Sequence, residues 1–99
     1  MTFSRTDQGD RTTLKIDGSL DAVSTPDLRP LIETSVAEKR PQIEIDCGSL
    51  RLIDSSGVGA IVAQYKRIRA QGGRVSVIGL RDQPLAIFKL LRLDRVLSI

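Results

Sequence analysis

The chain has 99 residues, 40% of them hydrophobic and 27% charged, which allows one globular core and excludes both disorder and a membrane-spanning segment. It has no His, no Trp and one Cys, which excludes imidazole catalysis, Cys/His zinc sites, an internal disulfide and aromatic stacking of single-stranded nucleic acid. The net charge is +3, but residues 1–49 carry −3 and residues 50–99 carry +6, so we expect a polarised surface that suits docking to a charged partner.

The chain begins with the pattern of a β-hairpin. Residues 11–17 (RTTLKID) alternate apolar and polar side chains, which predicts a half-buried strand, and residues 2–6 predict a weaker one. Residues 7–10 (DQGD) between them are turn formers. No basic and apolar leader precedes this hairpin, and we expect a cytoplasmic protein.

The first predicted helix follows the hairpin. Thr25 is predicted as its N-cap, with Pro26 at the first helical position and Asp27 in the first turn. The apolar positions that follow have helical spacing: Leu28, Leu31, Ile32 and Val36. Residues 40–41 (RP) end the helix. Pro30 conflicts with this register, because it loses a hydrogen bond and clashes with the carbonyl of Pro26, so either the first turn is distorted or the helix begins later.

Two further strands and two further helices complete the chain. Residues 42–47 (QIEIDC) and 74–79 (RVSVIG) predict strands, with Cys47 a buried strand residue and not a reactive thiol. The helix between them has one apolar face and stops at Gly72-Gly73; the face consists of Val58, Ile61, Val62, Tyr65 and Ile68. A last helix over about residues 82–91 buries Leu85, Phe88 and Leu91. Residues 96–99 add a short strand or a turn of helix.

The predicted order β-β-α-β-α-β-α places residues 1–99 in the α/β class, as a single domain with a small mixed, mostly parallel sheet and helices packed on it. Functional groups collect beyond the carboxyl ends of parallel strands. Three segments end there: Gly18–Asp21, Asp54–Ser56 and Gly79–Arg81. Asp21, Ser55 and Arg81 are therefore expected in one neighbourhood.

The segment of residues 52–60 (LIDSSGVGA) is the strongest candidate site. An Asp or Ser before a helix is also an ordinary N-cap, and that simpler reading stays open. It does not explain Gly57 and Gly59, which weaken the first turn but allow close approach of another molecule to bare backbone. Free N–H groups there favour an anion. Neither dinucleotide-binding nor P-loop glycine patterns fit, and Asp54 has no acidic neighbour, so no cofactor and no metal are expected.

These residues resemble a known family. The run DSSGVGA at 54–60, together with GSLD at 18–21, is similar to the STAS domain of bacterial anti-sigma factor antagonists, and the resemblance extends over essentially the whole chain. It implies that Ser55 is phosphorylated by an anti-sigma factor that is also a serine kinase. It further implies that the unphosphorylated form binds this kinase and releases a sigma factor, and that a PP2C-type phosphatase reverses the switch. Asp21 and Asp54 match acids beside the phosphosite.

The resemblance makes the protein a substrate and not an enzyme, with partner binding expected around Asp21, Asp54, Ser56, Gly57 and Gly59. Ser56 and Ser55 stay alternatives for N-cap and target, with Ser55 preferred as the target. Asp21 either belongs to the site or only orders its turn. We expect a monomer or weak dimer, without nucleic-acid binding or membrane insertion.

A basic group on the central helix is the possible docking face: Lys66, Arg67 and Arg69. The alternative is a solvated helix surface. Two other functions stay open: a STAS scaffold subunit of a stress-signalling assembly, and a STAS subunit of a lipid-transport ABC system.

Overall fold

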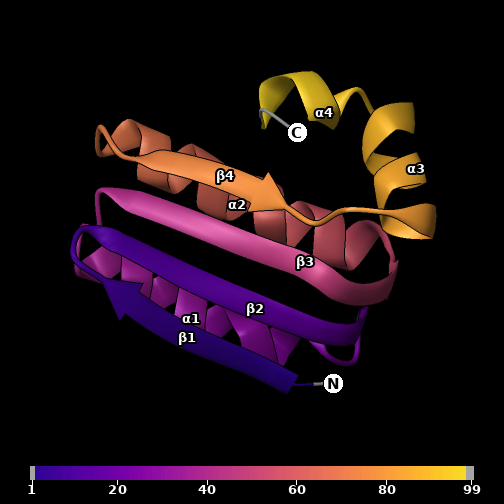
Figure 1. Cartoon of the computed structure of the whole chain (residues 1–99), viewed down its shortest axis with the longest axis horizontal. Helices are drawn as coiled ribbons and strands as arrows, with labels where there is room; N and C mark the ends of the chain where they lie inside the picture. The colour runs from indigo at the N-terminus through magenta and orange to yellow at the C-terminus, as the bar shows by residue number, and fades with distance from the viewer. Residues whose placement is uncertain (1, 98–99) are drawn as a thin grey trace.

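Four strands form one mixed sheet in the computed structural model, which describes residues 2–97 (Figure 1). Strand β1 (Thr2–Gln8) pairs antiparallel with β2 (Arg11–Leu20), as the predicted hairpin requires. Strands β3 (Gln42–Ile53) and β4 (Arg74–Ile78) continue the sheet in parallel, so that spatial order equals chain order. The predicted mixed, mostly parallel sheet is confirmed.

The helices α1 (Thr25–Ala37) and α2 (Ser55–Ala70) lie behind the sheet in Figure 1. Helix α3 (Asp82–Leu90) and the short α4 (Leu93–Val96) lie beyond the β4 edge. The order β-β-α-β-α-β-α is confirmed, with α4 as an additional turn of helix. The predicted tail element lies partly outside the described residues, since Val96 ends α4 and residues 98–99 are not described.

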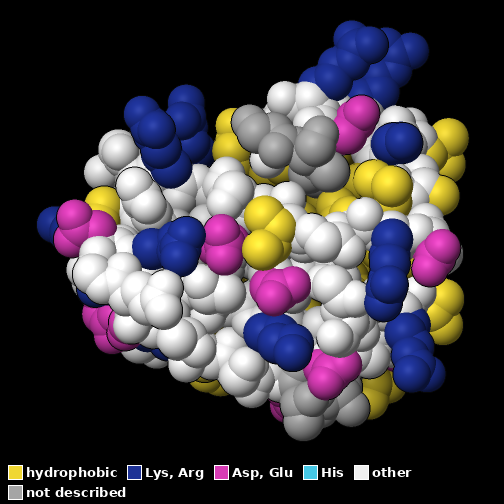
Figure 2. Space-filling model, viewed as in Figure 1, with side chains coloured by type: hydrophobic (Ala, Val, Ile, Leu, Met, Phe, Trp, Pro, Cys, Tyr) yellow, Lys and Arg dark blue, Asp and Glu magenta, His cyan; other side chains and the backbone are white. Residues whose placement is uncertain are grey.

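The core lies between one face of the sheet and the helices. Its largest fully buried side chains come from two strands and three helices: Leu14, Ile16, Leu20, Leu28, Ile43, Ile45, Ile61, Ile68 and Phe88. Leu91, predicted to be buried, is 51% exposed, because α3 ends one residue before it. The opposite face of the sheet carries interspersed basic and acidic side chains (Figure 2).

Helix α1 begins one residue earlier than predicted. Ser24, not Thr25, is the N-cap, and its side chain makes no capping hydrogen bond. The helix continues through Pro30, whose exposed ring faces outward, so the alternative of a later start is wrong. It also ends earlier, at Ala37, because Lys39 adopts a left-handed conformation with φ of 52° before Arg40.

Strand β3 is twice as long as its predicted extent. Its pairing with β2 shifts register twice, between Lys15 and Asp17 and between Gly18 and Ser19, and each shift leaves an extra residue in β3. Such bulges interrupt the apolar alternation from which a strand is recognised. The longer β3 extends past the end of β4 and delivers Asp54 directly to the start of α2.

Candidate functional site

Ser55 is the first residue of α2, directly after the end of β3. Asp54 is the N-cap: its Oδ1 accepts hydrogen bonds from the N–H groups of Ser56, at 2.9 Å, and Gly57, at 3.2 Å. The expectation that one of the two serines caps the helix is therefore wrong. Both serines are exposed, and no hydrogen bond among the described residues uses the Ser55 hydroxyl.

Asp54 also joins the starts of α1 and α2. Its second carboxylate oxygen, Oδ2, accepts a hydrogen bond from the N–H of Ala22 at 3.2 Å. Its own N–H donates to the carbonyl of Leu20 at 3.1 Å. The loop after β2, which contains Asp21, is thereby held beside Ser55, as the arrangement of parallel strands predicts.

Asp21 orders the loop in which it lies. Its Oδ1 accepts hydrogen bonds from the N–H groups of Val23 and Ser24, both at 3.0 Å, and from the Ser24 hydroxyl at 3.1 Å. The hydrogen bonds from Ser24, backbone and side chain, lower the pKa of Asp21. Asp21 therefore orders its turn, which is one of the two roles considered for it from the sequence. Val23, at the tip of the same loop, is 87% exposed.

The two glycines of α2 differ in their surroundings. A Cβ on Gly57 would lie 2.7 Å from Ile53 Cγ1 and 2.8 Å from the carbonyl oxygen of Leu20, so Gly57 is required by packing inside the protein. The expectation that its backbone is open to a partner is wrong, because it is buried. Gly59 is exposed, and a Cβ there would meet no atom within 4 Å. Only Gly59 leaves bare helix backbone accessible from outside.

A groove of about 530 Å³ lies between α1 and α2 and includes Ser55. Helix α2 lines it with Ser56, Gly59, Ala60, Ala63 and Arg67. The facing loop and helix contribute Ala22, Thr25, Pro26, Arg29, Ile32 and Glu33. Small side chains therefore line the part of the groove next to Ser55, and charged ones the part farther along α2.

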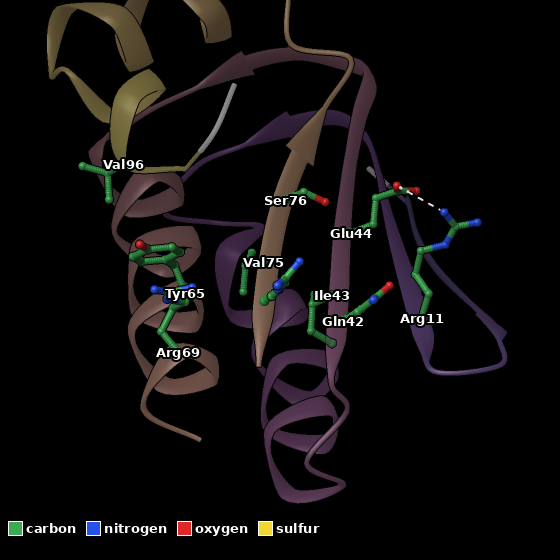
Figure 3. Close-up of a pocket in the computed structure, with 10 residues that line it drawn as sticks. Arg11, Gln42, Ile43, Glu44, Tyr65, Arg69, Val75, Ser76 and Val96 are labelled. Atoms are coloured by element: carbon green, nitrogen blue, oxygen red, sulfur yellow. Dashed lines mark ion pairs between the residues drawn. The ribbon is translucent and has the colours of Figure 1, made fainter. Parts of the chain in front are cut away.

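The three basic residues of the predicted docking face do not share one surface. Arg67 lies in the α1–α2 groove, where its guanidinium donates two hydrogen bonds to the Glu33 carboxylate, the longer one at 3.0 Å. This ion pair lowers the pKa of Glu33. Arg69 instead lines a second cavity, of about 590 Å³, together with Tyr65 and the start of β4 (Figure 3). Lys66, directly before Arg67 in sequence, is exposed and makes no ion pair among the described residues.

Just beyond the third predicted segment, Gly79–Arg81, a residue that the sequence did not single out contacts the end of β3. Gln83 in α3 binds the end of β3: its side chain accepts a hydrogen bond from Ile53 N–H and donates one to Ile53 O, both at 2.9 Å. Among the described residues, no hydrogen bond or ion pair joins Arg81 to Asp21 or Ser55. A glutamine that pairs with backbone has no sequence pattern that would reveal it.

The remaining chemistry of the described residues is sparse. Cys47 is fully buried, as predicted, and burial raises the pKa of its thiol to about 12. Within residues 2–97, no group of three or more acidic or Cys side chains could hold a metal ion. No helix among these residues is long and apolar enough to cross a bilayer.

Known proteins have sequences similar to this chain. The chain is 27% identical over 86 residues to the anti-sigma-B factor antagonist of Bacillus subtilis, covering 87% of this chain and 78% of the relative. The antagonist of Listeria monocytogenes is 23% identical over 90 residues, 91% of this chain and 79% of the relative.

Solved structures of the antagonist SpoIIAA have the same fold. Its unphosphorylated form aligns with a TM-score of 0.75 at 21% identity, covering 99% of this chain and 100% of SpoIIAA. The phosphorylated form from Bacillus aligns with a TM-score of 0.79 at 21% identity, over 95% and 86%. A family model described as MlaB, STAS domain, matches residues 3–98. The chain belongs to the STAS domain family.

Proposed function

We propose that this protein is an anti-sigma factor antagonist whose switch is Ser55. The unphosphorylated protein, a cytoplasmic monomer or weak dimer, binds an anti-sigma factor that is also a serine kinase, and the sigma factor is released. Phosphorylation of Ser55 ends this binding, and a PP2C-type phosphatase restores it. The protein is a substrate in this cycle and not an enzyme. The names of its relatives support the first of these steps.

The exposed, unengaged hydroxyl of Ser55 carries the proposal. Because Asp54 supplies the cap, Ser55 is not needed to stabilise α2, and its side chain is free to enter a kinase active site. Ser56 follows one position later on the same exposed turn. The neighbouring groove and the bare backbone of Gly59 allow a partner to approach closely.

Phosphorylation acts at the interface in this proposal and leaves the fold intact. The phosphate adds about −1.5 to −2 charges at pH 7. Repulsion by Asp54 costs about 1–3 kcal/mol, and attraction to the start of α2 returns about 0.3–1 kcal/mol. A partner that had buried the neutral hydroxyl must now desolvate a dianion, which costs several kcal/mol. Binding is therefore more sensitive to the phosphate than stability is.

Phosphorylation is tested directly by incubating the protein with ATP and each serine-kinase anti-sigma factor of its source genome. One phosphate is expected, on Ser55 by mass spectrometry, with Ser56→Ala modified normally and Ser55→Ala unmodified. Modification of Ser55→Ala to the full extent would exclude Ser55 as the phosphosite.

A second candidate is the STAS subunit of a lipid-transport ABC system. The family model that matches residues 3–98 is described as MlaB, STAS domain, with no mention of a sigma factor, and this favours keeping the candidate. Such a subunit binds an ABC ATPase and needs no phosphate on Ser55. Co-purification of the tagged chain from its own organism separates the two functions: an ATPase of the kinase type supports the antagonist, and an ABC ATPase supports the transporter subunit.

A further inference from the structure

The start of α2 is poorly placed to hold a phosphate on Ser55 by itself. A helix N-terminus binds anions through unpaired N–H groups, but Asp54 already accepts hydrogen bonds from Ser56 and Gly57. The N–H of Val58 is bonded to the carbonyl of Asp54 at 3.0 Å. The capping carboxylate also repels the phosphate. Holding a phosphate on Ser55 in one position therefore requires a cationic group outside α2.

Arg29 is the cation available in the same groove. It lies in α1, lines the cavity that contains Ser55, and makes no ion pair among the described residues. The other arginine of the groove, Arg67, is occupied by Glu33. Ala22 and Gly59, which carry little or no side chain, line the same groove as Arg29 and Ser55.

Thr25 provides a second observation at the same place. It lines the groove, is 4% exposed, and its hydroxyl is a buried side-chain oxygen without a hydrogen-bond partner among the described residues. An unpartnered buried hydroxyl destabilises a protein, so a ligand that accepts a hydrogen bond from it is favoured. To reach a ligand in the groove, this hydroxyl has to change rotamer about the Cα–Cβ bond of Thr25.

We propose that Arg29 and Thr25 form an internal receptor for the phosphate on Ser55. The inference rests on the proposed function only in that Ser55 carries the phosphate. In the phosphorylated protein the guanidinium of Arg29 donates hydrogen bonds to the phosphate oxygens, and the Thr25 hydroxyl donates another. The phosphate is then held against α1, and the charge of Asp54 is offset. Arg29 is withdrawn from any partner at the same time.

The test uses full-length protein in which phosphoserine is incorporated at position 55 during translation, so that no kinase is needed. The pKa of the phosphate is measured by ³¹P NMR titration. An opposite charge nearby lowers this pKa, and we expect it to be about 0.5–1 lower in the parent protein than in Arg29→Ala. Arg29→Lys, which keeps the charge but not the planar fork, is expected to lie between them. Arg95→Ala, a matched change on exposed α4, is expected to match the parent.

Equal phosphate pKa values in the parent and Arg29→Ala would overturn the proposal, as would an equal shift in Arg95→Ala. Thr25→Val gives an independent measurement. It is expected to leave the unphosphorylated protein as stable as the parent or more so, since it removes an unpartnered hydroxyl, and to destabilise only the phosphorylated protein. Destabilisation of both forms to the same extent would show that Thr25 is structural. The proposed function is tested separately by the kinase assay, whose failure leaves these results unaffected.

Discussion

Gly57 and Gly59 share a helical turn but have different physical reasons to be glycine. Gly57 faces Leu20 and Ile53, where no side chain fits. Gly59 faces open space at the rim of the α1–α2 groove. Glycine inside a helix costs about 0.5–1 kcal/mol relative to alanine, and at Gly59 nothing inside the protein offsets this cost. We expect a glycine at this position to serve a partner that approaches the groove.

The two glycines predict opposite effects of the same substitution. Gly57→Ala is expected to destabilise the protein by about 1–3 kcal/mol, since the methyl group is forced against the backbone of Leu20. Gly59→Ala is expected to stabilise it by about 0.5–1 kcal/mol while weakening binding of the anti-sigma factor. Urea unfolding and calorimetric titration measure the two effects. Stabilisation by Gly59→Ala with unchanged binding would remove this surface from the interface.

The lowered pKa of Asp21 leads us to expect a pH-dependent contribution of this residue to protein stability. Hydrogen bonds from Ser24 lower its pKa in the folded protein, so it stabilises the fold above its unfolded pKa of about 3.9. This contribution is lost as the pH falls through the folded value. Asp21→Asn is therefore expected to be less stable than the parent at pH 7, with the difference shrinking below about pH 4. A difference that stays constant between pH 7 and pH 3 in urea unfolding would show that the ionised carboxylate is unimportant.

At the scale of elements, one buried polar contact joins α1 and α2. The side-chain amide of Gln64 donates to the Ser35 hydroxyl at 3.1 Å, and that hydroxyl donates to the carbonyl of Ile32 at 2.8 Å. Gln64 is 1% and Ser35 0% exposed. This contact fixes the relative position of the two helices that line the groove beside Ser55.

Removing one partner of this contact is expected to destabilise the protein more than removing both partners. Ser35→Ala leaves the Gln64 amide buried without an acceptor and is expected to destabilise the protein by about 1–3 kcal/mol. Ser35→Ala combined with Gln64→Leu is expected to regain most of that stability, because no buried polar group is left unpaired. Denaturant titrations of the single and double variants give this comparison. Additive losses in the double variant would contradict it.

The sequence predicts element order well because apolar spacing and turn residues are local signals. The alternation in β2 and the spacing in α2 both led to the observed elements. The sequence does not predict the full length of β3, because two bulges break the apolar alternation of that strand. It does not predict the burial of Gln64 either, because a polar side chain is expected at the surface unless its buried polar partner is known. Ser55 was placed at the start of α2 by its motif. Which neighbours share its groove depends on how α1 packs on α2, and local spacing does not specify this.

At the scale of the whole molecule, the basic charge of the second half is spread over separate surfaces. Arg67 is neutralised by Glu33, and Arg69 lies in the cavity beside β4. Lys66 is exposed without an ion pair among the described residues, three helical turns from Ser55. Of the predicted docking residues, Lys66 is therefore the one best placed to attract an acidic partner that also covers Ser55.

Lys66→Glu is expected to slow association with the anti-sigma factor by up to about tenfold at low salt, with a smaller effect at high salt, because exposed charges are screened. Arg74→Glu, which makes the same change in net charge at the start of β4, is expected to have much less effect. Stopped-flow measurements at two salt concentrations compare the variants. If both variants slowed association equally, the effect would come from net charge and not from a docking surface. If Lys66→Glu did not slow association, Lys66 would be a solvated side chain without a role in docking.

In the proposed switch, the charge on Ser55 controls binding while the fold is retained. The most direct measurement compares the unphosphorylated protein with the protein carrying phosphoserine at position 55, by calorimetric titration with the anti-sigma factor and by urea unfolding. We expect affinity to fall by about a hundredfold or more, which corresponds to about 2.8 kcal/mol, with stability changed by no more than about 1–2 kcal/mol. Equal affinity for the two forms, or loss of binding accompanied by unfolding of the phosphorylated protein, would contradict the claim.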